Sequence, residues 1–573
     1  MLESLSSLED QGLNYIELHA ANVGIQTEKL ESLRISIAKG SPMWDTLDLC
    51  INVVDTESLD LLVHRLARLV RSSVGLNTRV GVASFISLLV QKVVMDIKPF
   101  TTMLLRLLFP VVTEEKSAVV KRAFASSCAS VLKYAAPSLA QKLIEETAAL
   151  HTGDKNAQIS CAILLKSYSS MASDVLSGYH AVIVPVIFIS RFDDDKYVSG
   201  LFEELWEENT SGDRVTLQLY LSEIISLICE SITSSSWSSK RKSAEAICKL
   251  AEVLGGSLSS YHHVLLESIM KEVPGRLWEG KDALLYAIAA ISTSCHKAIA
   301  IGDPATPLAI LKMVSSSCTK KDKKYREAAL SCLKEVIKAF GDPEFFNISF
   351  PLLLEMCNSA VPRRSGQAPL ASDVSKEEPE DANSSIPLDK VLDCVTSCIH
   401  AACVNDILEQ KKNLMQIFLI SLSAGFPWTV KMSAFSSIKE LCSRLENNLN
   451  DPEGTSSHAG ISFIVQELLH SLSPKVVECI STVKIAQYLD FSVVLIVIAF
   501  GLDSVLVHIA ASECLLRIFK LYRQIPFVAY TDFIFKSELL HQYEVEKNGE
   551  AKSLLEKCIE IIENLQLEKV QPT

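Results

Sequence analysis

Two tryptophan-led stretches decide the fold: Trp237–Leu254, WSSKRKSAEAICKLAEVL, and Trp278–Ser292, WEGKDALLYAIAAIS. In each stretch a lysine, Lys240 or Lys281, follows the tryptophan by three positions. These two lysines lie 41 residues apart. Apolar residues then return at the spacing of an α-helix, which indicates that one helical unit recurs along the chain.

The same layout recurs at six further places. In each case a residue that we call the anchor precedes a small or apolar residue by four positions. The anchor is basic or polar except in the last case, where it is valine. Together with the two stretches above, the pairs are Arg79/Ala83, Lys121/Ala125, Gln158/Ala162, Lys240/Ala244, Lys281/Leu285, Arg326/Leu330, Lys431/Phe435 and Val507/Ala511. Successive anchors are separated by 42, 37, 82, 41, 45, 105 and 76 residues. Two of these intervals are double periods, and the longest is a double period plus an insertion. A period near 40 predicts an all-α solenoid of HEAT or armadillo-type helix pairs, in which alanine lets neighbouring helices approach closely.

Composition agrees with a large helical protein. Apolar residues make up 48% of the 573 residues, while only 7% are aromatic and 21 residues are glycine. This is too little turn-forming glycine for many short strands, and the apolar content excludes a disordered chain. The formal net charge of −13 would repel a phosphate backbone, so we expect no nucleic acid among the partners.

Three of the five tryptophans occupy one repeat position, because Trp428 precedes Lys431 as Trp237 and Trp278 precede their lysines. We interpret the tryptophan as an aromatic wedge at the start of the inner helix, and the lysine as support for the inter-repeat turn. The alternative is a recognition ridge of exposed tryptophans.

The pattern divides the chain into five parts. We predict N-terminal helices over 1–58, HEAT-like repeats over 59–361, a disordered acidic insertion over 362–386, HEAT-like repeats over 387–545, and a C-terminal capping helix and tail over 546–573. The insertion is rich in proline, serine and acidic residues and lacks an apolar period.

No motif for catalysis or cofactor binding is present. The phosphate-binding, dinucleotide-binding, zinc-protease and hydrolase motifs are all missing from the sequence, so we expect neither an enzyme nor a cofactor. The cluster Cys394, Cys398, His400 and Cys403 has helical spacing in an apolar context, where cysteine acts as a small hydrophobe, so we expect no metal. The lysines over 320–324 and Arg326 form the one basic patch fit for phosphate, and we expect a solvated loop there.

Unbroken apolar runs are short. The two best, at 181–189 and 491–502, fall well below the roughly 20 residues that a membrane span requires, so we predict buried core helices and no transmembrane segment. Scattered single cysteines and the absence of a signal sequence near Met1 favour a cytoplasmic and nuclear location.

One block resembles a known family. The order VIVPVIFISRFDDD, LWEEN, LQLYLSEI, SSSWSSKRKSAEAICKLAE and PGRLWEGKDALLYAIAAI, over 180–291, is similar to the C-terminal part of the large HEAT-repeat proteasome adapter and scaffold proteins. Arg276, Trp278, Gly280, Lys281 and Asp282 match the last of these blocks. The resemblance extends from about Leu59 to the end of the chain, and because family members are far longer, it covers only their C-terminal portion.

The resemblance implies a noncatalytic scaffold that binds the 26S proteasome, through its 20S core and 19S regulatory particle, and supports its assembly, stability or localisation. An extended solenoid surface suits large protein partners. Another HEAT-type adapter, such as a nuclear transport receptor or a phosphatase scaffold, is the alternative.

Overall fold

The computed structural model describes residues 1–8, 27–360, 386–423, 425–449, 458–481, 494–524 and 536–567. These residues form helices joined by short turns, and no strand occurs among them, so the structure confirms the all-α prediction. They divide into two compact units, Met1–Gly255 and Gly256–Thr573. The predicted insertion over 362–386 lies outside the described residues except for its last position.

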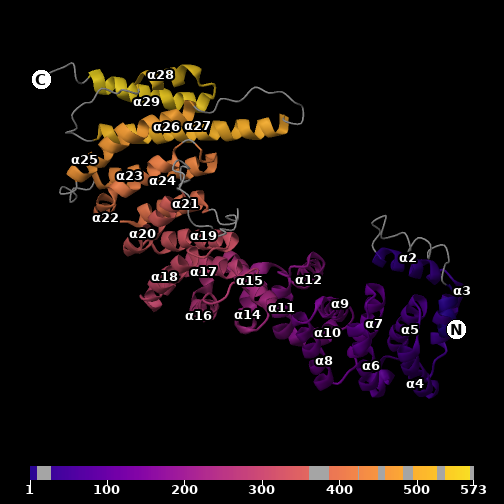
Figure 1. The fold of residues 1–573 in the computed structure, drawn as a ribbon. Helices are drawn as coiled ribbons and strands as arrows, with labels where there is room; N and C mark the ends of the chain where they lie inside the picture. The colour runs from indigo at the N-terminus through magenta and orange to yellow at the C-terminus, as the bar shows by residue number, and fades with distance from the viewer. Residues whose placement is uncertain are drawn as a thin grey trace, which may run out of the picture. The chain divides into compact units, whose positions relative to one another are not determined.

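Unit 1 contains helix pairs preceded by short N-terminal elements. Its helices are η1 (Leu2–Leu8), α2 (Thr27–Lys39), α3 (Pro42–Asn52), α4 (Thr56–Ser72), α5 (Leu76–Val93), η2 (Val94–Phe100), α6 (Thr101–Glu114), α7 (Ala118–Leu132), α8 (Pro137–Ala149), η3 (Leu150–Thr152), α9 (Lys155–Met171), α10 (Ser173–Leu176), η4 (Ser177–Tyr179), α11 (His180–Ser190), α12 (Lys196–Asn209), α13 (Asp213–Leu219), α14 (Leu221–Thr233) and α15 (Trp237–Leu254). The indigo-to-magenta helices of Figure 1 are these elements.

Unit 2 continues with the same kind of pair. Its helices are η5 (which begins at the boundary, Gly255–Ser260), α16 (His262–Glu272), α17 (Asp282–Gly302), α18 (Thr306–Cys318), α19 (Lys323–Phe340), α20 (Glu344–Ser359), α21 (Leu388–Ala401), α22 (Val404–Glu409), α23 (Lys411–Ser421), α24 (Trp428–Leu449), α25 (His458–Glu467), the π-helical η8 (Leu468–Leu472), α26 (Ser473–Ser481), α27 (Val494–Arg523), α28 (Lys536–Val545) and α29 (Gly549–Leu567). The predicted C-terminal capping helix corresponds to α29, which packs on α27 and α28.

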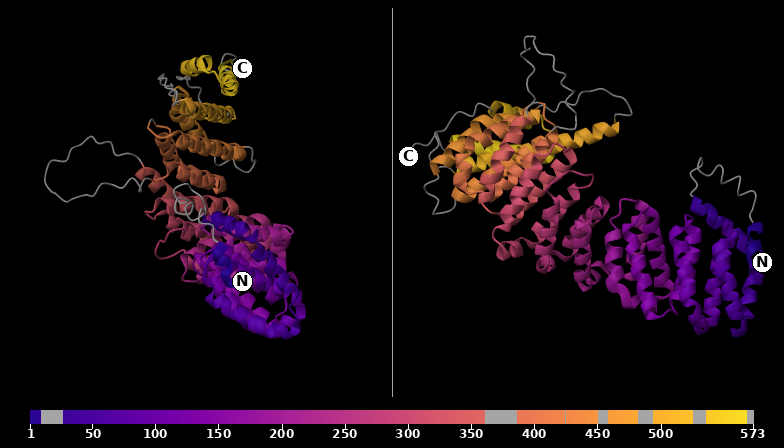
Figure 2. Two further views of the ribbon diagram at one scale, coloured as in Figure 1. Left: turned by 90° about the vertical axis from the view of Figure 1, so that its right-hand side faces the viewer. Right: turned by 60° about the horizontal axis from the view of Figure 1, so that its bottom comes forward.

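The second helix of each pair packs on the second helix of the next. In unit 1 this ladder runs α5, α7, α9 and α12, and in unit 2 it runs α17, α19, α21, α24, α27 and α29. Figure 1 and the right-hand view of Figure 2 show the ladder helices of each unit side by side. We call these the ladder helices below.

Local sequence explains where the ladder helices begin. Ser117, Asp154, Asp195 and Asp322 precede α7, α9, α12 and α19, and each side chain accepts a hydrogen bond from a backbone N–H of the first turn. Such caps satisfy donors that the helix itself leaves unpaired. Gly341 ends α19 with φ 61°, a conformation that glycine adopts without steric strain.

The repeat positions predicted from sequence pack as the solenoid requires. All eight residues placed four positions after an anchor, from Ala83 to Ala511, are at most 1% exposed. Cross-ladder side-chain bonds also display the period directly. Their partners lie 38 to 41 positions apart in Ser87–Ser127, Cys128–Tyr168, Lys166–Glu204, His400–Glu440 and Thr396–Ser437.

The tryptophan interpretation is wrong at two positions. Trp237 and Trp428 are the first residues of α15 and α24, and they are 56% and 39% exposed. An indole that faces solvent to this degree does not wedge two helices apart. Trp278 is half-buried and lies in the turn that precedes α17, outside the helix.

Three helical segments among the described residues are long and apolar enough to cross a membrane, judged by length and composition: Leu76–Glu114, Ser173–Ser190 and Asp282–Gly302. The bent pair α13–α14 would add a fourth. We predicted none, because we counted unbroken apolar runs and these segments are interrupted by polar residues. Within the fold, 50%, 50% and 44% of the three windows are buried, so neighbouring helices already use part of their apolar surface. The run at 181–189 lies in α11 and is mostly buried, as predicted, whereas that at 491–502 begins outside the described residues.

Candidate functional site: a polar groove on the ladder helices of unit 2

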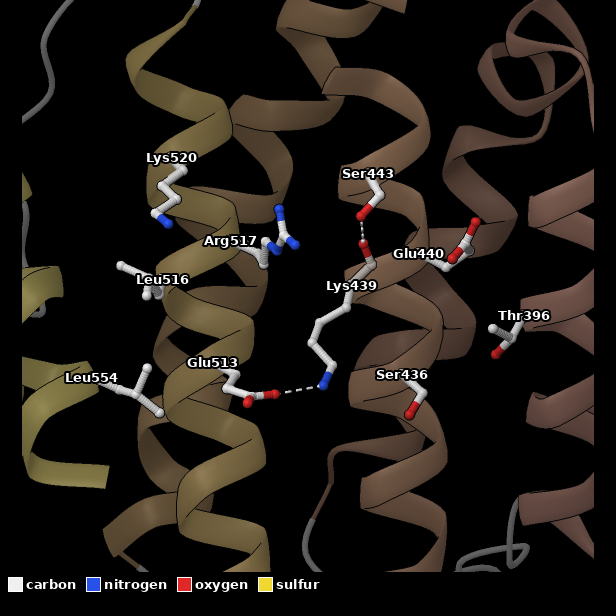
Figure 3. Close-up of a pocket in the computed structure, with 10 residues that line it drawn as sticks. All are labelled: Thr396, Ser436, Lys439, Glu440, Ser443, Glu513, Leu516, Arg517, Lys520 and Leu554. Carbon is white, nitrogen blue, oxygen red and sulfur yellow. Dashed lines mark hydrogen bonds and ion pairs between the residues drawn. The ribbon is translucent and has the colours of Figure 1, made fainter. Parts of the chain in front are cut away.

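A groove of about 590 Å³ crosses the ladder helices α21, α24, α27 and α29. It is lined by Thr396, Ser436, Lys439, Glu440, Ser443, Glu513, Leu516, Arg517, Lys520 and Leu554. Figure 3 shows these side chains on the facing surfaces of four successive helices. The groove therefore exists only because the repeats stack in register.

Polar contacts between neighbouring helices form the wall of the groove. Lys439 Nζ of α24 lies 2.7 Å from Glu513 Oε2 of α27, the bond drawn in Figure 3. Glu440 Oε1 lies 2.8 Å from His400 Nδ1 of α21. Each of these side chains is between 26% and 62% exposed, so water screens the pairs and each contributes little to stability.

One end of the groove is cationic. Arg517 and Lys520 project from α27 and are exposed, and Glu446 Oε2 lies 3.5 Å from Arg517 Nη1. Beside them Leu516 and Leu554 supply apolar surface. A polar, open groove with a few aliphatic contacts suits an extended segment of another protein better than an enclosed small molecule.

The residues singled out from the sequence lie elsewhere and serve the turns between helices. Lys281 is 2% exposed, and its Nζ donates to the carbonyl oxygens of Pro274 and Arg276 at 3.2 and 3.1 Å. These contacts tie Lys281 to the turn that precedes α17. Gly280 in this turn has φ 91°, a conformation that favours glycine.

The other signature positions divide by burial. Lys240 and Ala244 are buried in α15, at 9% and 0% exposed, whereas Lys431 of α24 is half-buried and Arg276 is exposed. None of the signature residues lines the groove. The sequence did carry one signal for it, since Glu513, Arg517 and Lys520 recur at a spacing of four and three, which places three charges on one face of α27.

The cysteine cluster is part of the core. Cys394 and Cys398 are fully buried in α21, and the Cys394 thiol donates to Leu330 O of α19 at 3.1 Å. Burial raises the pKa of Cys398 to about 12, which disfavours the thiolate that would bind a metal. Among the residues that the structure describes, no group of three or more metal-ligating side chains comes together.

Two family models match the chain. The model described as "Proteasome adapter and scaffold protein ECM29, HEAT-repeat domain" matches residues 1–152, and that described as "ECM29, C-terminal ARM-like repeats" matches residues 310–488. Both describe one family, and together they cover more than half of the chain. The chain belongs to the ECM29 family.

The ECM29 match corrects our prediction of where along the chain the family resemblance begins. Because the first model begins at residue 1, the resemblance includes the N-terminal helices that we set apart, and a start near Leu59 is wrong. The blocks quoted from 180–291 lie between the two matched ranges. The groove is formed in part by α21 and α24, which fall within the ARM-like match.

Curated members of the ECM29 family are similar at moderate identity. "Proteasome adapter and scaffold protein ECM29" of Homo sapiens is 31% identical over 366 residues, which are 62% of this chain and 20% of the human protein. "Proteasome component ECM29" of Saccharomyces cerevisiae is 27% identical over 299 residues, 52% of this chain and 16% of the yeast protein. "Proteasome-associated protein ECM29 homolog" of Drosophila melanogaster is 26% identical over 364 residues, which are 62% of this chain and 19% of the Drosophila protein. The matched part thus spans about a fifth of these relatives.

Proposed function

We propose that this chain is a noncatalytic scaffold segment that binds the 26S proteasome, contacts subunits of its 20S core and 19S regulatory particle, and supports proteasome assembly, stability or localisation. The proposal rests on membership of the ECM29 family, whose curated members are named as proteasome adapters, scaffolds or components. The stacked repeats support it, because within each unit they display the side chains of several helices on one surface.

The groove on α21, α24, α27 and α29 is our candidate contact surface within this segment. It carries charges of both signs on each of two helices, Lys439 and Glu440 on α24 and Glu513 and Arg517 on α27. Such a pattern selects a partner surface of matching charge order and affects the association rate more than the stability of the fold. We place the segment in the cytoplasm and nucleus, where proteasomes occur, and propose that it has no membrane-spanning function.

Affinity capture of the tagged chain from cell extract at moderate salt, followed by mass spectrometry, tests the proposal. We expect 20S and 19S subunits to be enriched together, and we expect the variant Arg517→Glu/Lys520→Glu to recover fewer of them. The matched control is Lys547→Glu/Lys557→Glu, which reverses two exposed charges of unit 2 outside the groove. Background levels of proteasome subunits with the unaltered chain would contradict the proposed function, and equal recovery by both variants would exclude the groove as the contact.

A further inference from the structure

A second surface of unit 2 lies at the amino-terminal ends of α17 and α19. A cavity of about 380 Å³ opens there between the turn that precedes α17 and the first residues of α19. It is lined by Leu277, Trp278, Glu279, Gly280, Asp282, Asp322, Lys324 and Tyr325. Trp278 is half-buried, and it lines the cavity beside the aliphatic Leu277.

The segment that contributes Asp322 and Lys324 to this cavity is rich in lysine, and we call its lysines the rim. It contains Lys320, Lys321, Lys323 and Lys324, all exposed, and Arg276, which precedes the lining residue Leu277, is exposed as well. Lys324 Nζ pairs with Asp282 Oδ2 at 3.2 Å. The side chains of Lys320, Lys321 and Lys323 have no ion-pair partner recorded within the described part of the chain.

The acidic residues of the cavity are already engaged. Asp322 caps α19, accepting a hydrogen bond from Tyr325 N at 2.8 Å, and Asp282 is paired with Lys324. Glu279 therefore remains as the one lining carboxylate without such a role, against four cationic side chains around the rim. This local excess of positive charge stands on a chain whose formal net charge is −13.

We propose that this surface, the Trp278 cavity with its lysine rim, binds an acidic segment of a partner protein that places an apolar side chain against Trp278. Cations at the rim attract the carboxylates, and a half-buried tryptophan in a pocket provides the desolvated aromatic anchor around which protein interfaces concentrate their binding energy. A phosphate backbone or a flat lipid surface would meet the lysines and leave the cavity unfilled. This proposal adds to the proposed function the chemistry of one partner segment. It rests on the proposed function only because it requires the partner to be a protein.

The test is fluorescence anisotropy with the full chain and a dye-labelled synthetic peptide of 14 residues, in which Phe alternates with runs of Glu and Asp. We expect binding that weakens as salt is raised. The variant Lys320→Glu/Lys321→Glu/Lys323→Glu should weaken binding about tenfold or more, because three exposed attractions become repulsions. Trp278→Ala should weaken it by a similar factor.

Matched controls separate this site from bulk charge. Lys412→Glu/Lys547→Glu/Lys557→Glu reverses three exposed lysines elsewhere in unit 2 and should bind the peptide like the unaltered chain. A peptide with Ser in place of Phe should bind as weakly as the peptide does to Trp278→Ala. Circular dichroism would reveal whether Trp278→Ala unfolds. If it does, Lys320→Glu/Lys321→Glu/Lys323→Glu still tests the proposal, because these lysines are exposed and their replacement should not affect folding.

Three results would overturn the proposal. The first is that the unaltered chain does not bind the peptide. The second is that the control variant loses as much peptide affinity as the variant of the rim lysines. The third is that single-stranded RNA or phosphatidylserine vesicles bind more tightly than the peptide and that the variant of the rim lysines abolishes this binding. Proteasome capture is an independent measurement. If capture fails while the peptide still binds through this surface, the proposed function is wrong and the acidic-segment surface stands.

Discussion

Lys121 shows how one buried charge joins two repeats. Its side chain is 1% exposed, and its Nζ donates to Val112 O of α6, to Asn156 O of α9 and to the Ser160 hydroxyl. The ammonium thus replaces water at the end of one helix and the beginning of another. Lys121 was identified from the sequence as the anchor of its repeat, but which carbonyl groups it binds depends on how the turns fold, and the spacing does not specify that.

We expect Lys121→Met to destabilise unit 1 by about 2 kcal/mol, because the carbonyl oxygens of Val112 and Asn156 lose their buried donor. The difference in unfolding free energy between the unaltered chain and Lys121→Met should depend on pH. Burial lowers the pKa of Lys121 to about 8, from 10.5. Between these two values the unfolded chain binds more protons than the folded one, so stability rises with pH in the unaltered chain and not in the variant.

Urea unfolding followed by circular dichroism at pH 7.5 and 9.0 measures this effect. Lys121→Arg keeps the charge and serves as the control that should lack the rise in this range, since arginine does not titrate there. A gap between the unaltered chain and Lys121→Met that stays constant with pH would contradict the prediction.

At the scale of elements, the turn between α11 and α12 holds three parts of unit 1 together. Its aspartates pair with basic residues of α9 and α15: Asp195 with Lys155, Asp194 with Arg241, and Asp193 with Lys242. In the last pair both side chains are 6% exposed. The sequence alone does not reveal these pairs, because the partners lie 40 or more residues away.

Lys242→Met should therefore cost about 3 kcal/mol, since it leaves the Asp193 carboxylate buried without a counter-charge. Asp193→Asn/Lys242→Met should recover part of that loss, because no uncompensated charge remains. Thermal unfolding of the two single variants and the double variant forms the cycle. Simple additivity of the two single effects would show that the pair does not interact.

The groove pair Lys439–Glu513 should behave in the opposite way. Both side chains are about a third or more exposed, so Lys439→Ala should change the unfolding free energy by less than about 1 kcal/mol. Differential scanning calorimetry checks this. A small effect would also make Lys439→Ala a well-folded variant for proteasome capture, whereas a loss of several kcal/mol would mean that the pair is structural.

For the whole molecule, stability should vary along each ladder. Interior helices such as α7 and α21 bury most of their residues between two neighbours, whereas α28 has two buried residues recorded, Leu539 and Gln542. Hydrogen exchange followed by mass spectrometry should accordingly show slow exchange in α7 and α21 and fast exchange in α28. Uniform protection across these helices would contradict a repeat array and indicate one cooperative unit.

At this scale the sequence was most informative about the period of the repeats and least informative about which side chains meet on the surface of the stacked helices. Ala125 and Ala244 occupy the repeat position four residues after the anchor, so their burial could be predicted from position. The groove could not, because its side chains come from four helices spread over Thr396–Leu554 and converge only after stacking. Trp237 was misassigned because an aromatic residue at a helix start has the same spacing whether it faces a neighbour or solvent.

The cross-repeat bonds at 38 to 41 positions have a consequence for how the protein is made. In these bonds each residue is synthesised within about 40 residues of its partner. At roughly 5 to 20 residues per second, a ribosome delivers that partner in about 2 to 8 seconds. Packing of local helices is far faster than this. Within each unit, a repeat joined to its neighbour by such bonds can therefore pack as soon as it emerges from the ribosome.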